Sequence, residues 1–76
     1  MPKLPHPTGR EMLRFLQKQG YVLSHVRGSY HSYMKGKIKL SIPVHSGKTL
    51  RIGTLHNLIR SMELTTEEFV KLFRGQ

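Results

Sequence analysis

The chain has 76 residues, contains no cysteine, and carries 13 Lys or Arg against 4 Asp or Glu, which gives a formal net charge of +9 at pH 7. A chain of this length has a small core, so we expect a single domain over residues 1–76 with a shallow surface site. The lack of cysteine excludes disulfides and thiolate metal sites, and no apolar run is long enough for a signal peptide or a membrane span, so we expect a cytoplasmic protein.

The first expected element is a helix over residues 9–19, after a proline-rich, extended lead-in at residues 1–7. Thr8 and Glu11 have the spacing of a capping box, and Gly20 is typical of a residue that ends a helix. The apolar residues at helical spacing are Met12, Leu13, Phe15 and Leu16.

Three strands are expected next, over residues 21–27, 30–34 and 37–42, where β-forming residues are frequent. The third alternates polar and apolar residues, which puts each kind on its own face. The apolar face is Ile38, Leu40 and Ile42, and the polar face is Lys37, Lys39 and Ser41. Pro43 ends this strand because it lacks a backbone donor, and the short links between the strands require an antiparallel meander.

After a loop at residues 44–50, two further helices are expected, from about residue 51 to 62 and over residues 66–74. The first has a core stripe of Leu55, Leu58, Ile59 and Met62. The second begins at a capping box of Thr65 and Glu68 and should pack through Phe69, Leu72 and Phe73. The order α-β-β-β-α-α predicts an α+β fold with a three-stranded antiparallel sheet, helices on one face and the other face open.

The positive charge is concentrated in residues 1–60, which hold eleven Lys or Arg and one acid. A compact basic body indicates a polyanionic partner, with nucleic acid ahead of an acidic protein or a membrane surface. The row Lys35, Lys37 and Lys39 fits phosphate contacts, although a merely solvated strand face would look the same.

Histidine is the residue that fits catalysis best, because a neutral imidazole can remove the proton of a ribose 2′-hydroxyl, which then attacks the adjacent phosphorus. His31 lies in the second expected strand, and its alternative is a partly buried residue that shares a face with Tyr33. His45 lies in the loop before the second helix, and its alternative is an ordinary loop residue. His25 and His56 are assigned to surface or packing positions. No histidine spacing suits a metal site, and we expect neither a metal nor another cofactor.

Tyr30 and Tyr33 could stack on RNA bases, but aromatic residues in strands are more often part of a core. By alternation one of the two faces inward and the other outward, and the sequence leaves open which.

Four segments, in this order, resemble the HicA family, also called YcfA-like. They are Gly-Tyr-Val-Leu at 20–23, Arg-Gly-Ser at 27–29 before a histidine-bearing strand, Ile-Pro-Val-His-Ser-Gly-Lys at 42–48, and Gly-Thr-Leu-His-Asn-Leu-Ile at 53–59. The resemblance spans roughly residues 8–64. It implies a fold like a double-stranded RNA-binding domain, metal-independent cleavage of messenger RNA, and an antitoxin of the HicB type that covers the active face. Residues 66–74 form an additional C-terminal helix beyond this common core.

The sequence departs from the family at one position. The family usually has its catalytic histidine directly after Gly-Ser, whereas here Tyr30 occupies that place and His31 follows. Adjacent strand residues point to opposite faces, so His31 can replace the missing side chain only if a bulge re-aims it. A phenol, whose ordinary pKa is near ~10, is a poor general base at neutral pH. Weak activity, activity through His45, and RNA binding without cleavage all stay open.

The candidate site follows from these observations. The candidate catalytic residues are His31, Tyr30 and His45. The candidate RNA-binding residues are Arg27, Ser29, Lys35, Lys37, Lys39 and Lys48. The leading hypothesis is a metal-independent endoribonuclease toxin, and the alternative is a non-catalytic RNA-binding domain of the same fold. A module that docks an acidic protein is a third possibility, against which salt-sensitive RNA binding would argue.

Overall fold

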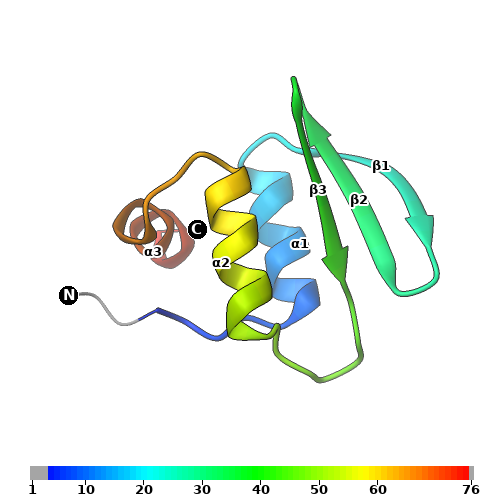
Figure 1. Ribbon diagram of the computed structural model, residues 1–76, viewed down its shortest axis with the longest axis horizontal. Helices are drawn as coiled ribbons and strands as arrows, with labels where there is room; N and C mark the ends of the chain where they lie inside the picture. Colours follow the sequence, from blue (N-terminus) through cyan, green and yellow to red (C-terminus); the bar gives the residue numbers. More distant parts are fainter. Residues whose placement is uncertain (1–3, 76) are drawn as a thin grey trace.

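The chain folds into three helices and three strands, in the order expected from the sequence (Figure 1). The computed structural model describes residues 4–75, so residues 1–3 of the expected lead-in lie outside the described part. The elements are α1 (Gly9–Lys18), β1 (Val22–Arg27), β2 (Tyr30–Lys35), β3 (Ile38–Pro43), α2 (Ile52–Ser61) and α3 (Thr66–Arg74). The α+β class and the three-stranded antiparallel sheet are confirmed. No helix within residues 4–75 has the length and apolar character needed to cross a membrane.

Both expected capping boxes are present. The hydroxyl of Thr8 accepts a hydrogen bond from the Glu11 N–H at 3.2 Å, and the Glu11 carboxylate accepts one from the Thr8 N–H at 2.8 Å. Thr65 and Glu68 make the same two bonds at 3.1 and 2.9 Å. Each box satisfies two N–H groups that have no partner inside a helix, so these residues set where α1 and α3 begin.

The elements form layers, with the sheet on one side and α3 on the other (Figure 1). The strands follow the order β1-β2-β3, and α1 and α2 lie side by side against one face, nearest β3. α3 packs on these two helices on the side away from the sheet. All six residues of β1 are exposed, because the helices do not extend over this edge strand. The face of the sheet turned away from the helices is open, as expected.

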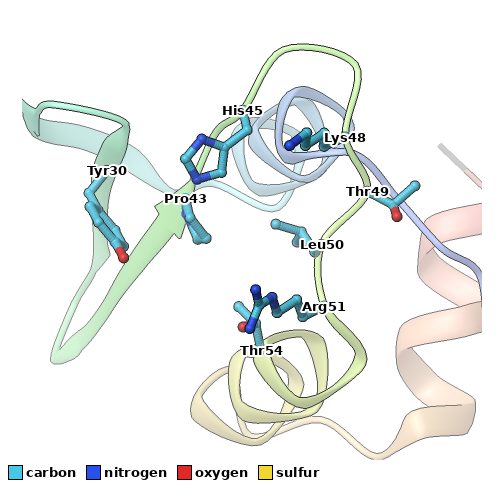
Figure 2. A pocket seen from close by; sticks show the side chains of 8 residues that line it. All are labelled: Tyr30, Pro43, His45, Lys48, Thr49, Leu50, Arg51 and Thr54. Atoms are coloured by element: carbon cyan, nitrogen blue, oxygen red, sulfur yellow. The ribbon is translucent and has the colours of Figure 1, made fainter.

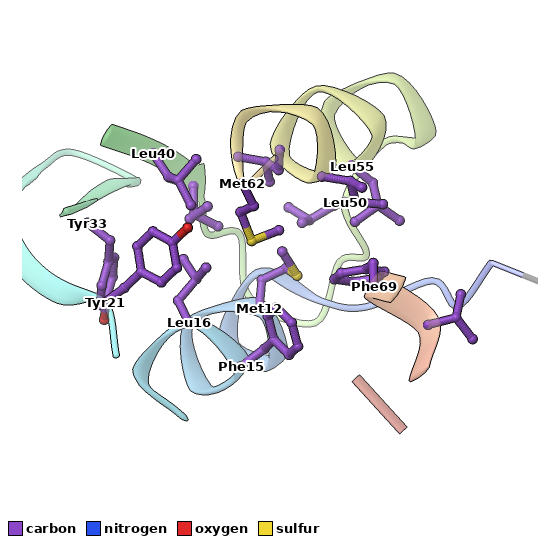
Figure 3. Close-up of a cluster of buried hydrophobic side chains, with 14 residues drawn as sticks. Met12, Phe15, Leu16, Tyr21, Tyr33, Leu40, Leu50, Leu55, Met62 and Phe69 are labelled. Atoms are coloured by element: carbon purple, nitrogen blue, oxygen red, sulfur yellow. The ribbon is translucent and has the colours of Figure 1, made fainter. Parts of the chain in front are cut away.

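The core lies where the three helices meet β2 and β3 (Figure 3). Phe15 on α1 and Phe69 on α3 are fully buried and meet edge to face, with 5.1 Å between ring centroids. The expectation that α3 packs through Leu72 was wrong, because Leu72 is 39% exposed while Val70 is buried. Phe73 also packs on Phe15, with 5.7 Å between the ring centroids. The buried stripe of α3 therefore runs through positions 69, 70 and 73. Position 72 lies at the margin of this stripe.

α1 begins in close contact with the end of β3. A Cβ atom on Gly9 would lie 2.8 Å from the carbonyl oxygen of Pro43 and 2.9 Å from the Cα of Val44. We expect Gly9→Ala to lower the free energy of unfolding by about 1–3 kcal/mol, because the backbones must move apart. Urea unfolding followed by circular dichroism measures this change.

Gly53→Ala is the matched control for that substitution. A Cβ at Gly53, inside α2, meets no atom within 4 Å. Alanine should therefore raise the free energy of unfolding by about 0.5–1 kcal/mol, through the better helix propensity of alanine. Equal effects at the two glycines would show that the close approach at Gly9 is absent in solution.

Candidate nucleic-acid interface

The directions of Tyr30 and His31 follow from the alternation of β2. Tyr33 is 2% exposed and faces the helices, so His31, two residues earlier, faces them too and lies opposite the buried Ile42. The pairing of β2 with β3 runs without a bulge along the whole of β2. Tyr30 therefore lies on the open face, where it is 53% exposed. His31 does not replace the side chain at position 30, since the two residues point to opposite faces.

The surroundings of His31 are those of a residue between sheet and helices. Its side chain is half-buried, and within residues 4–75 its buried Nδ1 has no hydrogen-bond partner. A buried nitrogen without a partner costs folding free energy, on the order of 1–3 kcal/mol. His31 therefore shares a face of the sheet with Tyr33 and is partly buried. This is the alternative to a catalytic role that the sequence had left open.

The loop between β3 and α2 is fastened at both ends by backbone contacts. At its start, the Val44 N–H donates to the carbonyl oxygen of Ser29 at 2.7 Å, which ties the loop to the turn before β2. At its end, the Leu50 N–H donates to the carbonyl oxygen of Pro7 at 2.9 Å, and the Leu50 side chain is buried. These contacts fix the loop, and His45 with it, beside the first residue of β2.

A hollow of about 470 Å³ opens between the end of the sheet and the start of α2 (Figure 2). Its lining residues are Tyr30, Pro43, His45, Lys48, Thr49, Leu50, Arg51 and Thr54. Tyr30 stands on one side of the hollow, with His45 and Pro43 next to it. Arg51 and Thr54 lie across the hollow from Tyr30. The volume is within the ~300–1,000 Å³ typical of ligand sites. An aromatic ring, an imidazole and two cations can together hold a base and its phosphate.

The expected lysine row is divided between two sides of the sheet. Lys39 is exposed on the open face opposite Met34, and Lys37 is exposed in the turn before β3. Lys35 instead pairs with Ile38 on the helix side, where its Nζ donates to the carbonyl oxygen of Gln19 at 2.7 Å. Lys35 therefore ties β2 to the end of α1, and only Lys37 and Lys39 remain on or beside the open face.

The other candidate RNA-binding residues lie near the hollow. Arg27 is exposed directly opposite Tyr30 on β1. Lys48 lines the hollow itself, and the carbonyl of Ser29 holds the loop through Val44. Arg27 is thus the cross-strand neighbour of Tyr30, and Lys48 lines the same hollow as Tyr30.

Sequence reasoning missed Arg51 and Thr54 as lining residues and the direction of His25. Arg51 and Thr54 belong to the start of α2, and only the three-dimensional path of the loop brings them opposite Tyr30. His25 lies opposite Ser32, which shares the open face with Tyr30. No pattern in the sequence marks either feature.

The charge around the open face has one sign. Between Glu11 and Glu63 the chain carries nine Lys or Arg and no acid, and this stretch includes all three strands and the loop. Within residues 4–75 no three histidine or acidic side chains gather closely enough to hold a metal ion. Unbalanced positive charge on an open sheet attracts a polyanion over a distance of about one Debye length, ~8–10 Å.

Fold and face together define a small α+β domain that resembles a double-stranded RNA-binding domain and has a basic, open sheet. The family model described as HicA toxin of bacterial toxin-antitoxin matches residues 9–64. This is more than half of the chain, so the chain belongs to the HicA family and is a toxin of the toxin–antitoxin type. The resemblance seen in the sequence is thereby confirmed. Comparison with curated proteins gave no match.

Proposed function

We propose that this toxin is an RNA-binding, metal-independent endoribonuclease that acts on messenger RNA in the cytoplasm. The observation that carries the proposal is the hollow that Tyr30, His45, Lys48 and Arg51 line together. A base can stack on the exposed ring of Tyr30 while the cations hold the adjoining phosphates. His45 supplies an imidazole at the rim, where it can donate or accept a proton.

The partner we propose is an antitoxin of the HicB type that covers the open face. Membership of the HicA family implies pairing with an antitoxin. The uniform positive charge of the strands and loop favours an acidic surface on that protein, because complementary charge speeds association and selects the partner. Covering the hollow at Tyr30 would exclude RNA from it.

A second function is a non-catalytic RNA-binding domain of the same fold. The observation that favours it is Tyr30 at the place of the family's usual histidine, with His31 turned to the helices. On this reading the face keeps its phosphate contacts and its stacking ring but lacks a suitable base at position 30.

Cleavage and binding of long single-stranded RNA by the purified protein in EDTA distinguish these functions. We expect the wild-type protein to cleave the RNA and to bind it more weakly as salt rises. Lys39→Gln should weaken binding and reduce the slope of log affinity against log salt by about 0.7, the value for one lost phosphate contact on a single strand.

Lys71→Gln on α3 is the matched control, because Lys71 lies on the helix farthest from the sheet. It should leave the slope unchanged. Salt-sensitive binding without cleavage would select the non-catalytic function. Equal slopes for wild type and Lys39→Gln would remove this lysine from the interface.

A further inference from the structure

The pairing of β1 with β2 contains a bulge that turns His25 to the open face. Leu23 lies opposite Tyr33, and the next paired residue is His25, opposite Ser32, so Ser24 is the extra residue. Without the bulge, His25 would share the helix side with Leu23, two residues earlier. Bulges are frequent beside active sites, where they re-aim a side chain. The extra residue therefore gives the open face an imidazole on a strand.

His25 lies in a groove of about 200 Å³ on this face, with three serines and Lys39 around it. Its Nε2 is 3.4 Å from the hydroxyl of Ser32 and its Nδ1 is 3.4 Å from the hydroxyl of Ser24. Both contacts are at the long end of hydrogen-bond distances, so they are weak and a bound RNA can replace either of them. Ser32 is two residues from Tyr30 along β2, about 7 Å, which is close to the length of one nucleotide.

The three histidines near the sheet differ in what they can reach. His31 faces the helices with a buried Nδ1, so it cannot meet RNA bound to the open face. His45 lies on the loop at the rim of the hollow. His25 is exposed on the open face and held by the strand pairing beside Ser32. It combines access with a fixed position beside the row that holds Tyr30.

We propose that His25 is a catalytic residue of this toxin, the general base for RNA cleavage in place of the histidine missing at position 30. The inference rests on the endoribonuclease function proposed above. RNA would lie along the open face with one base on Tyr30 and the next ribose in the groove of His25. Lys39, which lines the same groove, binds the phosphate.

The reaction at this groove is a transfer within the RNA strand. The neutral imidazole of His25 takes the proton of the ribose 2′-hydroxyl, and the 2′-oxygen bonds to the adjacent phosphorus. The bond from phosphorus to the 5′-oxygen breaks, and that oxygen takes a proton from solvent, to which the groove is open. The ammonium of Lys39 stabilises the negative charge of the phosphorane. The imidazolium returns its proton to solvent, and the products carry a 2′,3′-cyclic phosphate and a 5′-hydroxyl.

His25→Gln and His56→Gln, compared with wild type in EDTA, test the assignment. His56 is exposed on α2 and lines neither the hollow at Tyr30 nor the groove at His25, so it controls for the loss of an imidazole. We expect His25→Gln to reduce the cleavage rate about 10²-fold or more while RNA affinity stays within about threefold. His56→Gln should match wild type in both measurements.

The other outcomes overturn the proposal in distinguishable ways. Cleavage that survives in His25→Gln and is lost in His45→Gln would overturn the role of His25 and leave the endoribonuclease intact. An equal loss of rate and affinity in His25→Gln, with an unchanged circular dichroism spectrum, would make His25 a binding residue only. Salt-sensitive RNA binding by a wild-type protein that never cleaves would overturn both proposals together.

Discussion

Tyr30→His is expected to raise the rate of RNA cleavage by about 10²-fold over wild type. Position 30 lies on the open face at the wall of the hollow, opposite Arg27 and Pro43. An imidazole there is a competent base at neutral pH, whereas a phenol is a poor one. Initial rates on long single-stranded RNA in EDTA measure the gain.

Tyr30→Phe is the control for this gain. Phenylalanine keeps the aromatic ring that stacks on a base and adds no titratable group. Its cleavage rate and RNA affinity should stay within a few-fold of wild type. Equal rates for Tyr30→His and Tyr30→Phe would mean that an imidazole at position 30 does not reach a ribose 2′-hydroxyl of the bound RNA.

Phe69→Ala is expected to lower the free energy of unfolding by about 3–5 kcal/mol. The Phe69 ring is fully buried, meets Phe15 edge to face at 5.1 Å and stacks on Phe73 at 5.4 Å. Its removal leaves a cavity between α3 and α1 and loses both aromatic contacts. A domain of this length has roughly 4–11 kcal/mol of total stability, so the effect is a large fraction of it. Urea unfolding gives the value, and Phe69→Leu gives a milder one if the alanine variant does not fold.

Leu72→Ala on the same helix is the matched control. Its side chain is 39% exposed, so truncation should cost less than about 1 kcal/mol. If Leu72→Ala were the more damaging change, α3 would pack through a different stripe from the one described. The two variants therefore test the rotation of α3 about its axis as well as its stability.

Local sequence patterns predicted every element of this fold and its approximate bounds. The strict alternation of residues 38–42 identified the buried side of β3, and the capping boxes at Thr8 and Thr65 fixed two helix starts. These signals act between residues close in the chain, which is why a single sequence is enough to read them.

What the sequence could not predict depends on contacts between distant segments. Val70 is buried and Leu72 is exposed on α3, whose Phe69 and Phe73 rings pack on Phe15 of another helix. The side of the sheet that Lys35 occupies follows from the register with Ile38, and the direction of His25 from an extra residue in β1. Turn chemistry and the pairing of the strands set the directions of Lys35 and His25. A shift of one residue in the pairing register turns a side chain to the opposite face of the sheet.

The candidate site was predicted in part. The sequence left open which of Tyr30 and Tyr33 faces outward, and the structure puts Tyr30 there, on one hollow with His45 and Lys48. It could not bring Arg51 to the opposite wall, because that contact depends on where the loop is fastened. The assignments of catalysis and RNA contact to these residues remain predictions.

The bulge at Ser24 also changes the free edge of the sheet. β1 is a fully exposed edge strand, with Val22 68% and Val26 50% exposed. An unpaired edge of this kind can recruit another strand and seed aggregation. The extra residue kinks β1 near its middle, so an incoming strand would find two short stretches in place of one regular edge, and Arg27 adds a repelling charge at its end. The same irregularity that aims His25 outward therefore makes the β1 edge a less regular template for pairing with another strand.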